Sequence, residues 1–233
     1  MKLLLCSDFS GVGFRFLKKF FKETKGLNCL FVGYANDDED DELESGAATR
    51  FKEMGMNVFS LTENYEFSDK IDIVFVRGGN TTRLIHLLRQ YGQYNKIKDL
   101  VEKQGVLYIG SSAGSVLAGT DTEYTLESEP YEPDLKPLFG AEAFKGFGWI
   151  DKLVFVHCNK YVMMYEKVND KYEFFRVPDT FCYPAYLADK KKFKREQYLK
   201  IDNNAAFMVN GKAQQMLKFN WGHLPVKEYI FED

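Results

Sequence analysis

The stretch KIDIVFVRGGN (70–80), continued by TTRLIHLLRQYG (81–92), decides the fold that this sequence predicts. The first part is an apolar run of strand length that ends in two glycines. The second part carries apolar residues at the spacing of one helical face. These are Leu84, Leu87, Leu88 and Tyr91. A buried strand is therefore expected to lead directly into an amphipathic helix.

The same alternation recurs on both sides of this stretch. KLLLCSDF (2–9) predicts a strand and residues 13–26 a helix, while LNCLFVGYAN (27–36) and GVLYIGSSAGSVLAG (105–119) begin two further strand units. The strands are apolar throughout, which is typical of strands covered on both faces. We therefore predict an α/β fold with a mostly parallel central sheet, helices on both faces, and one domain over residues 1–233.

Beyond residue 120 the alternation is less regular. WIDKLVFVHCNKY (149–161) predicts another strand, KVNDKYEFFRV (167–177) a hairpin, and residues 197–217 a strand followed by a second hairpin.

The composition is that of an ordinary globular protein, with 45% hydrophobic and 28% charged residues and a net charge of −3. No basic surface is expected, so nucleic acid and membranes are not predicted partners. The N-terminus lacks a signal-peptide core and no apolar run is long enough to span a bilayer, which predicts a cytoplasmic protein. The four cysteines are scattered, so we expect free thiols and no zinc site.

The segment YIGSSAGSVLAG (108–119) contains three serines between a predicted strand and a short helix. A nucleophile on such a sharp turn needs glycine two residues before and two residues after it, because side chains there would clash. Ser112 alone meets this requirement, with Gly110 and Gly114. We therefore predict Ser112 as a catalytic nucleophile.

A serine hydroxyl needs a base, and three histidines are available. His86 lies off the apolar stripe of its helix and is expected on the surface. His157 follows a predicted strand, where sites of α/β proteins form. His223 lies near the C-terminus.

Two chain orders remain open from the residues alone. An esterase of α/β-hydrolase type would use Ser112, an acid and then His223, with Asp179, Asp189 or Asp202 as the acid. The other order is Ser112, His157 and a later acid. Cys158, next to this second histidine, is interpreted as a packing residue.

Four segments resemble the dipeptidase E (aspartyl dipeptidase) and cyanophycinase-like serine hydrolases, relatives of the class I glutamine amidotransferase fold. They are FVRGGNTTRLIHLL (75–88), YIGSSAGS (108–115), FVHCN (155–159) and IDNNAAFMVNG (201–211). The resemblance implies acyl transfer without a metal or organic cofactor. It also implies short peptide substrates with an N-terminal aspartate, and a monomer or homodimer.

The resemblance implies roles for individual residues. Ser112 would be the nucleophile, His157 the general base and then acid, and Asp202 the group that orients the imidazole. The amides of Gly79 and Ala113 would form the oxyanion hole. The substrate-binding candidates are Arg77 and Asn80, although a surface ion pair explains Arg77 equally well. A catalytically silent binding protein on the same scaffold is the remaining hypothesis.

Overall fold

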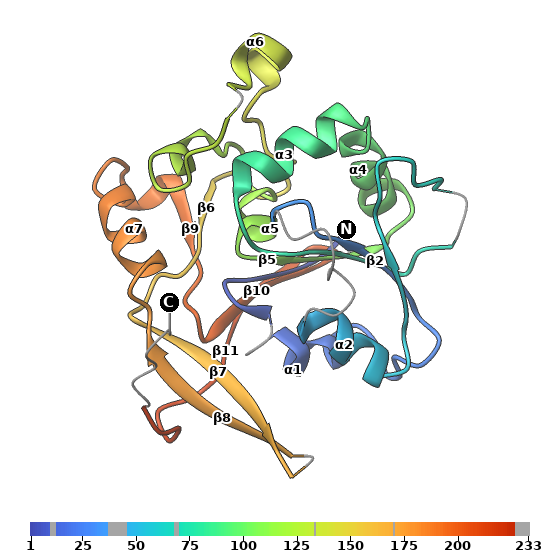
Figure 1. Cartoon of the computed structure of the whole chain (residues 1–233), viewed down its shortest axis with the longest axis vertical. Coiled ribbons are helices and arrows are strands. Elements are labelled where there is room, and N and C mark those ends of the chain that lie inside the picture. The colour runs from blue at the N-terminus through green and yellow to red at the C-terminus, as the bar shows by residue number, and fades with distance from the viewer. Residues whose placement is uncertain (10–12, 37–45, 68–69, 133, 170, 227–233) are drawn as a thin grey trace.

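The computed structural model describes residues 1–9, 13–36, 46–67, 70–132, 134–169 and 171–226 (Figure 1). Its central sheet has seven strands in the order β11-β10-β1-β5-β4-β2-β3. The strands are β1 (Lys2–Cys6), β2 (Asn28–Val32), β3 (Asn57–Ser60), β4 (Ile73–Val76), β5 (Leu107–Ser111), β10 (Ala205–Asn210) and β11 (Ala213–Lys218). The strands β1, β5, β4, β2 and β3 run parallel to one another, and β10 and β11 extend the sheet antiparallel beyond β1. The predicted mostly parallel sheet is confirmed.

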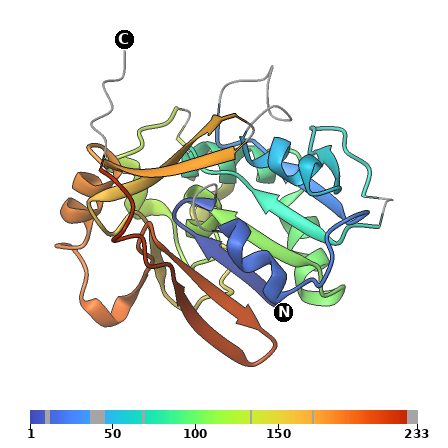
Figure 2. The same cartoon turned by 90° about the horizontal axis from the view of Figure 1, so that it is seen from below.

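Helices cover both faces of this sheet (Figure 1). Successive residues of each strand point to opposite faces, so Leu3 and Leu5 enter one core while Leu4 and Cys6 enter another. The first core packs against α3 (Thr81–Gln90) and α4 (Tyr94–Lys103), and the second against α1 (Phe14–Phe16) and α2 (Gly46–Glu53). Seen from below, the β10–β11 hairpin extends beyond the body of the sheet (Figure 2). The apolar strands are thus buried on two sides, as their sequence predicted.

The second half of the chain adds a small sheet that positions the site. The elements from residue 113 on are α5 (Ala113–Val116), α6 (Lys136–Phe139), β6 (Leu153–Phe155), β7 (Tyr161–Val168), β8 (Lys171–Pro178), α7 (Cys182–Asp189) and β9 (Tyr198–Lys200), with short 3-10 turns at Glu123–Glu127, Gly140–Glu142 and Arg195–Gln197. A further 3-10 turn, Leu17–Lys19, follows α1 in the first half. β6 pairs with β9 in parallel, separately from the central sheet. The chain segments that follow these two strands therefore lie side by side.

Both expected hairpins are present, as β7–β8 and β10–β11. The strand expected over 149–161 is shorter, because only Leu153–Phe155 is paired in β6. Within the described residues, no helix combines the length and apolar character needed to cross a membrane.

The expectation that His86 lies on the surface is wrong. Its side chain is 8% exposed, and Nδ1 lies 2.9 Å from the Tyr131 hydroxyl. Residues after α5 fold back over this side of α3, where Tyr131 and Phe139 contact the imidazole. The helical wheel identified the apolar stripe of α3 that faces the core. The face of α3 that carries His86 is covered as well, by the segment of Tyr131 and Phe139.

Candidate active site

Ser112 lies between the end of β5 and the first residue of α5, in a backbone conformation that residues other than glycine rarely adopt (φ 49°, ψ −112°). An added Cβ on Gly110 would lie 2.6 Å from the carbonyl carbon of Gly114. A Cβ on Gly114 would lie 2.3 Å from the carbonyl oxygen of Val76. The unusual backbone angles of Ser112 cost about 1–3 kcal/mol, and such strain is typical of functional positions. The two glycines allow the sharp turn for the steric reason that the sequence indicated.

The neighbouring serines have structural contacts instead. Ser111 Oγ accepts the N–H of Phe9 at 3.2 Å. Ser115 is fully buried, and its Oγ lies 2.7 Å and 2.8 Å from the carbonyl oxygens of Cys6 and Gly110. Of the three serines, Ser112 is the one whose residue lines the adjacent cavity.

His157 follows β6, and its Nε2 lies 2.9 Å from Ser112 Oγ. Its backbone also has a positive φ of 53°. The main chain is held there because its N–H donates to Ser7 Oγ at 3.0 Å, and that hydroxyl donates to the Ile201 carbonyl at 2.9 Å. The structure therefore brings Ser112 and His157 together from opposite halves of the chain.

The other ring nitrogen, Nδ1, lies 2.8 Å from Asn203 Oδ1. Asn203 is fully buried, and its Nδ2 donates to the carbonyl oxygens of Asn159 and Tyr161 at 3.0 and 2.8 Å. Because those acceptors require the amide NH₂ on their side, the amide oxygen faces the ring. His157 then carries its proton on Nδ1, which leaves Nε2 as an acceptor for the Ser112 hydroxyl.

Asp179 places a carboxylate beside this pair, with Oδ2 3.7 Å from His157 Nδ1 and 3.4 Å from Asn203 Nδ2. Its Oδ1 accepts the N–H groups of Cys182 and Tyr183 at the start of α7. Burial lowers the pKa of His157 below its ordinary value, although the charge of Asp179 and the Asn203 hydrogen bond oppose that shift. The imidazole is therefore neutral near pH 7 and able to accept a proton.

Asp202, which the resemblance assigned to the imidazole, does not lie on the ring in this structure. Its carboxylate oxygens lie 2.9 Å from Lys200 Nζ and 3.9 Å from Lys218 Nζ. The ring contact belongs to the next residue, Asn203. Both residues lie in the turn between β9 and β10, and the hydrogen bonds of Asn203 to residues 159 and 161 are what hold its side chain against the ring. Serine triads usually place an acid beside the histidine, whereas an asparagine there is known from cysteine proteases. The presence of a serine nucleophile therefore gave no reason to choose Asn203 from the sequence.

A cavity of about 450 Å³ opens beside Ser112 and His157. Aromatic residues of its lining include Tyr124, Phe155 and Tyr186. Helix α7 contributes one side, and residues 124–130 contribute another. The volume is within the usual range of small-molecule sites.

Not all of the remaining predicted site residues line this cavity. Gly79 and Asn80 line it, whereas half-buried Arg77 is not among its described lining residues. The side chain of Asn80 caps α3, since its Oδ1 accepts the N–H of Arg83 at 2.9 Å. Ala113 is the first residue of α5, so its N–H has no acceptor within that helix.

One group of described residues brings three metal-ligating atom types together, namely His157, Asp179 and Cys182, with their ligand atoms within 4.8 Å of one another. Both ring nitrogens of the histidine already have partners in Ser112 and Asn203. Burial raises the pKa of the Cys182 thiol to about 12, which disfavours a thiolate ligand. We interpret this group as part of the hydrogen-bond chain behind the imidazole.

Cys158 packs as expected. It is 3% exposed, in a cluster with Phe155 and Tyr198, and burial raises the pKa of its thiol to about 12. The esterase order required His223 at the serine. His223 is exposed and its ring faces Phe219, while His157 occupies the position beside Ser112.

A serine on a strained strand-to-helix turn of a parallel sheet, hydrogen-bonded to a histidine, is typical of α/β serine hydrolases. Comparison with known proteins narrows this class. The model of peptidase family S51 matches residues 13–216, and the chain belongs to that family. The expectation of a serine-type peptidase related to dipeptidase E is thereby confirmed.

Individual relatives agree with this assignment. The chain is 30% identical to Peptidase E of Haemophilus influenzae over 59% of this chain and 67% of that protein. It is 31% identical to a probable alpha-aspartyl dipeptidase of Drosophila melanogaster over 52% of each chain, so that alignment spans about half of the fly protein. A crystal structure of a candidate Peptidase E protein from Listeria monocytogenes EGD-e matches the fold with a TM-score of 0.71 and 21% identity, covering 94% of this chain and 98% of that one.

The close approach of α5 to β4 gives a stability prediction. Gly114→Ala would drive a methyl group into the Val76 carbonyl, and we expect it to lower the free energy of unfolding by about 3 kcal/mol. Urea unfolding measures this loss. Gly222→Ala is the matched control, because its Cβ would be 3.4 Å from the nearest side-chain atom, Asn220 Oδ1, and its effect should stay within about 0.5 kcal/mol. Equal stabilities of the two variants would contradict the steric explanation of the turn.

The charge of Asp179 gives a pH prediction. Peptidase kcat/KM should fall on the acid side with a midpoint below about 6.5, because burial lowers the pKa of His157. Asp179→Asn removes a charge that raises this pKa, so the midpoint should move to still lower pH, with a loss of about tenfold in the plateau rate.

Asp202→Asn is the control for this pH profile, and it should leave the midpoint unchanged because Asp202 pairs with lysines away from the ring. A midpoint that responds to Asp202 and not to Asp179 would restore the original assignment.

Proposed function

We propose that this chain hydrolyses short peptides through a covalent ester on Ser112, with His157 as general base and then general acid. The observation that carries the proposal is the 2.9 Å contact between His157 Nε2 and Ser112 Oγ on the strained turn. The Nδ1–H tautomer supports it, since Asn203 leaves Nε2 free to receive the serine proton.

The proposed reaction has two halves. Ser112 Oγ attacks the peptide carbonyl while its proton moves to His157 Nε2, and the negative oxygen that forms is stabilised by the amides of Gly79 and Ala113. The C–N bond then breaks as Nε2 gives the proton to the leaving amine. A water molecule, deprotonated by the same nitrogen, attacks the ester carbonyl, and Nε2 returns the proton to Ser112 Oγ as the C–O bond breaks and the acid is released.

Asn203 and Asp179 have supporting roles in this proposal. Asn203 accepts the Nδ1–H hydrogen bond and fixes the ring. Asp179, 3.7 Å from Nδ1, stabilises the imidazolium that forms when the serine proton arrives. The neutral side chain of Asn203 thus orients the ring, and the negative charge that stabilises the imidazolium comes from Asp179 behind it.

The preference for short peptides draws on the relatives, one of which is named for alpha-aspartyl dipeptides, and on the limited cavity volume. The resemblance implies cleavage after an N-terminal aspartate, with Arg77 or Asn80 contacting the substrate, but the described cavity lining holds no lysine or arginine that would bind an aspartate side chain. The single domain over 1–233, the cytoplasmic location and a monomeric or homodimeric state stay predictions.

Ser112→Ala tests the proposal. We expect kcat/KM on dipeptides to fall by at least about three orders of magnitude, because no other nucleophile can form the ester. The thermal unfolding midpoint should stay close to that of the wild type. Ser111→Ala, which loses only the contact with the Phe9 amide, should keep most of the activity. Unchanged hydrolysis in Ser112→Ala would reject Ser112 as the nucleophile, whereas no hydrolysis by the wild type would favour the silent binding scaffold.

A further inference from the structure

The charge of the cavity beside Ser112 is one-sided. Two carboxylates line it, those of Glu129 and Asp189, and its described lining contains no lysine or arginine. Asp189 forms an ion pair with Lys192, whose Nζ lies 3.1 Å from Oδ1. Among the described residues, Glu129 has no cationic partner in an ion pair. The cavity therefore offers one uncompensated negative group to a ligand.

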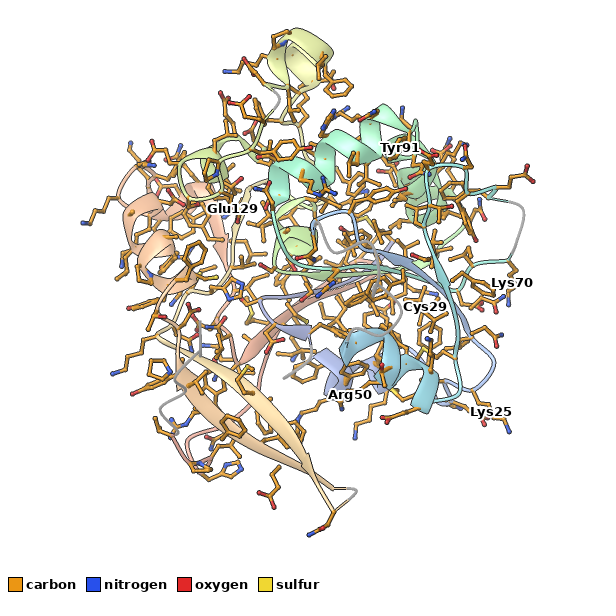
Figure 3. All side chains as sticks on the ribbon, viewed as in Figure 1. Lys25, Cys29, Arg50, Lys70, Tyr91 and Glu129 are labelled. Carbon is orange, nitrogen blue, oxygen red and sulfur yellow. The ribbon has the colours of Figure 1, made fainter. Side chains whose placement is uncertain are left out.

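Glu129 is held near the reacting serine by its contacts with the start of α3. Its Oε2 accepts the N–H of Thr81 at 2.7 Å, and Asn80 Nδ2 lies 3.3 Å from the Glu129 carbonyl oxygen. These residues follow Gly78 and Gly79 in the chain, and a Cβ on Gly78 would lie 2.7 Å from Ser112 Cβ. Figure 3 shows Glu129 in the region between the start of α3 and α7. Glu129 thus lines the same cavity as Ser112, and its carboxylate is held by the start of α3.

Building on the peptidase function proposed above, we propose that Glu129 binds the α-ammonium group of the first residue of the substrate, and that this residue has an uncharged side chain. In a peptide that is cleaved after its first residue, the ammonium nitrogen is only two bonds from the carbonyl carbon that Ser112 attacks. An anionic partner must then lie in the same small cavity, and Glu129 is the carboxylate there without a cation.

The electrostatic state of Glu129 agrees with this role. Burial and, to a smaller extent, the nearby charge of Asp189 raise the pKa of Glu129, although the hydrogen bond from Thr81 opposes this shift. The protein itself therefore compensates the ionised carboxylate only in part. A bound ammonium group supplies a positive charge beside the carboxylate. The hydrogen bond that it donates to Glu129 is charge-assisted, and it is stronger than in water because the site is partly shielded from solvent.

The side chain of the first residue meets an apolar wall. Phe155 is 2% exposed and packs against Tyr124 with ring centroids 4.7 Å apart. The hydroxyl of Tyr124 is engaged with the Val154 carbonyl, so its ring is what remains for a ligand. An aspartate side chain here would add a third carboxylate to a cavity whose described lining holds no cation. Leucine or phenylalanine would instead bury apolar surface.

The experiment compares kcat/KM for three matched peptides, Leu-Leu, Asp-Leu and N-acetyl-Leu-Leu. We expect Leu-Leu to exceed each of the other two by at least about tenfold. In Glu129→Gln, which keeps an oxygen to accept the Thr81 N–H, the value for Leu-Leu should fall by about 10- to 100-fold while the small value for the acetylated peptide hardly changes. Glu132→Gln, an exposed glutamate three residues along the same segment, is the control and should behave as the wild type.

Two results would overturn the inference. A preference for Asp-Leu over Leu-Leu would show that the cavity selects an acidic side chain. An equal loss on the free and the acetylated peptide in Glu129→Gln would make Glu129 structural only.

Failure of the peptidase proposal has a different signature, namely hydrolysis that survives in Ser112→Ala or no hydrolysis of any peptide. Calorimetric binding of the three peptides to Ser112→Ala tests recognition without turnover. The same order of affinities is expected there, and equal or reversed affinities would reject the inference.

Discussion

The close contact between α5 and the strands β4 and β5 is the constraint on which the site depends. Backbone atoms of residues 110 and 114 approach so nearly that neither position has room for a Cβ, and Gly114 also lies against the Val76 carbonyl. This packing forces Ser112 into its unusual backbone angles and directs its hydroxyl toward the cavity. The strain is sustained because the two flanking elements are themselves buried in the larger core. Reactivity at one residue is therefore a consequence of packing over several elements.

A hydrogen-bond chain continues from that serine into the protein. It passes from Ser112 through His157 to Asn203, with Asp179 beside both of the last two. Each member has further contacts that fix its orientation, and the members come from four separate segments of the chain. The parallel pairing of β6 with β9 brings His157 and Asn203 to the same end of a small sheet. Hence the small sheet, although separate from the central one, determines how the base is presented.

Much of this could be predicted from the sequence, because the relevant signals are local. The apolar strands and the glycines around Ser112 report steric requirements that act within a few residues, and they predicted the observed sheet and the serine that lies beside His157. His157 was found because it follows a strand and lies in a segment that resembles a known family. The helix at Tyr94–Lys103 was not anticipated, although its apolar positions Ile97, Leu100 and Val101 are buried.

The rest could not be predicted because it depends on tertiary placement. Which of two adjacent residues, Asp202 or Asn203, faces the ring is decided by how the turn after β9 packs against residues 159–161, and no local pattern reveals that packing. The burial of His86 is decided by a covering segment some 45 residues later in the chain. The charge of the cavity is likewise invisible in the sequence, since Glu129 and Asp189 are 60 positions apart and meet only in the folded chain.

The β7–β8 hairpin has a consequence for how this protein can diversify. It leaves the body of the molecule directly after the segment of His157 and returns directly before Asp179, where the Asp179 N–H donates to the Lys160 carbonyl at 2.9 Å. Its two ends are thus held together at the base, so lengthening the loop between them adds only about 0.6 kcal/mol of closure entropy for each doubling. Related chains can exchange, extend or trim this arm and acquire new binding surfaces while the bond-breaking groups keep their places.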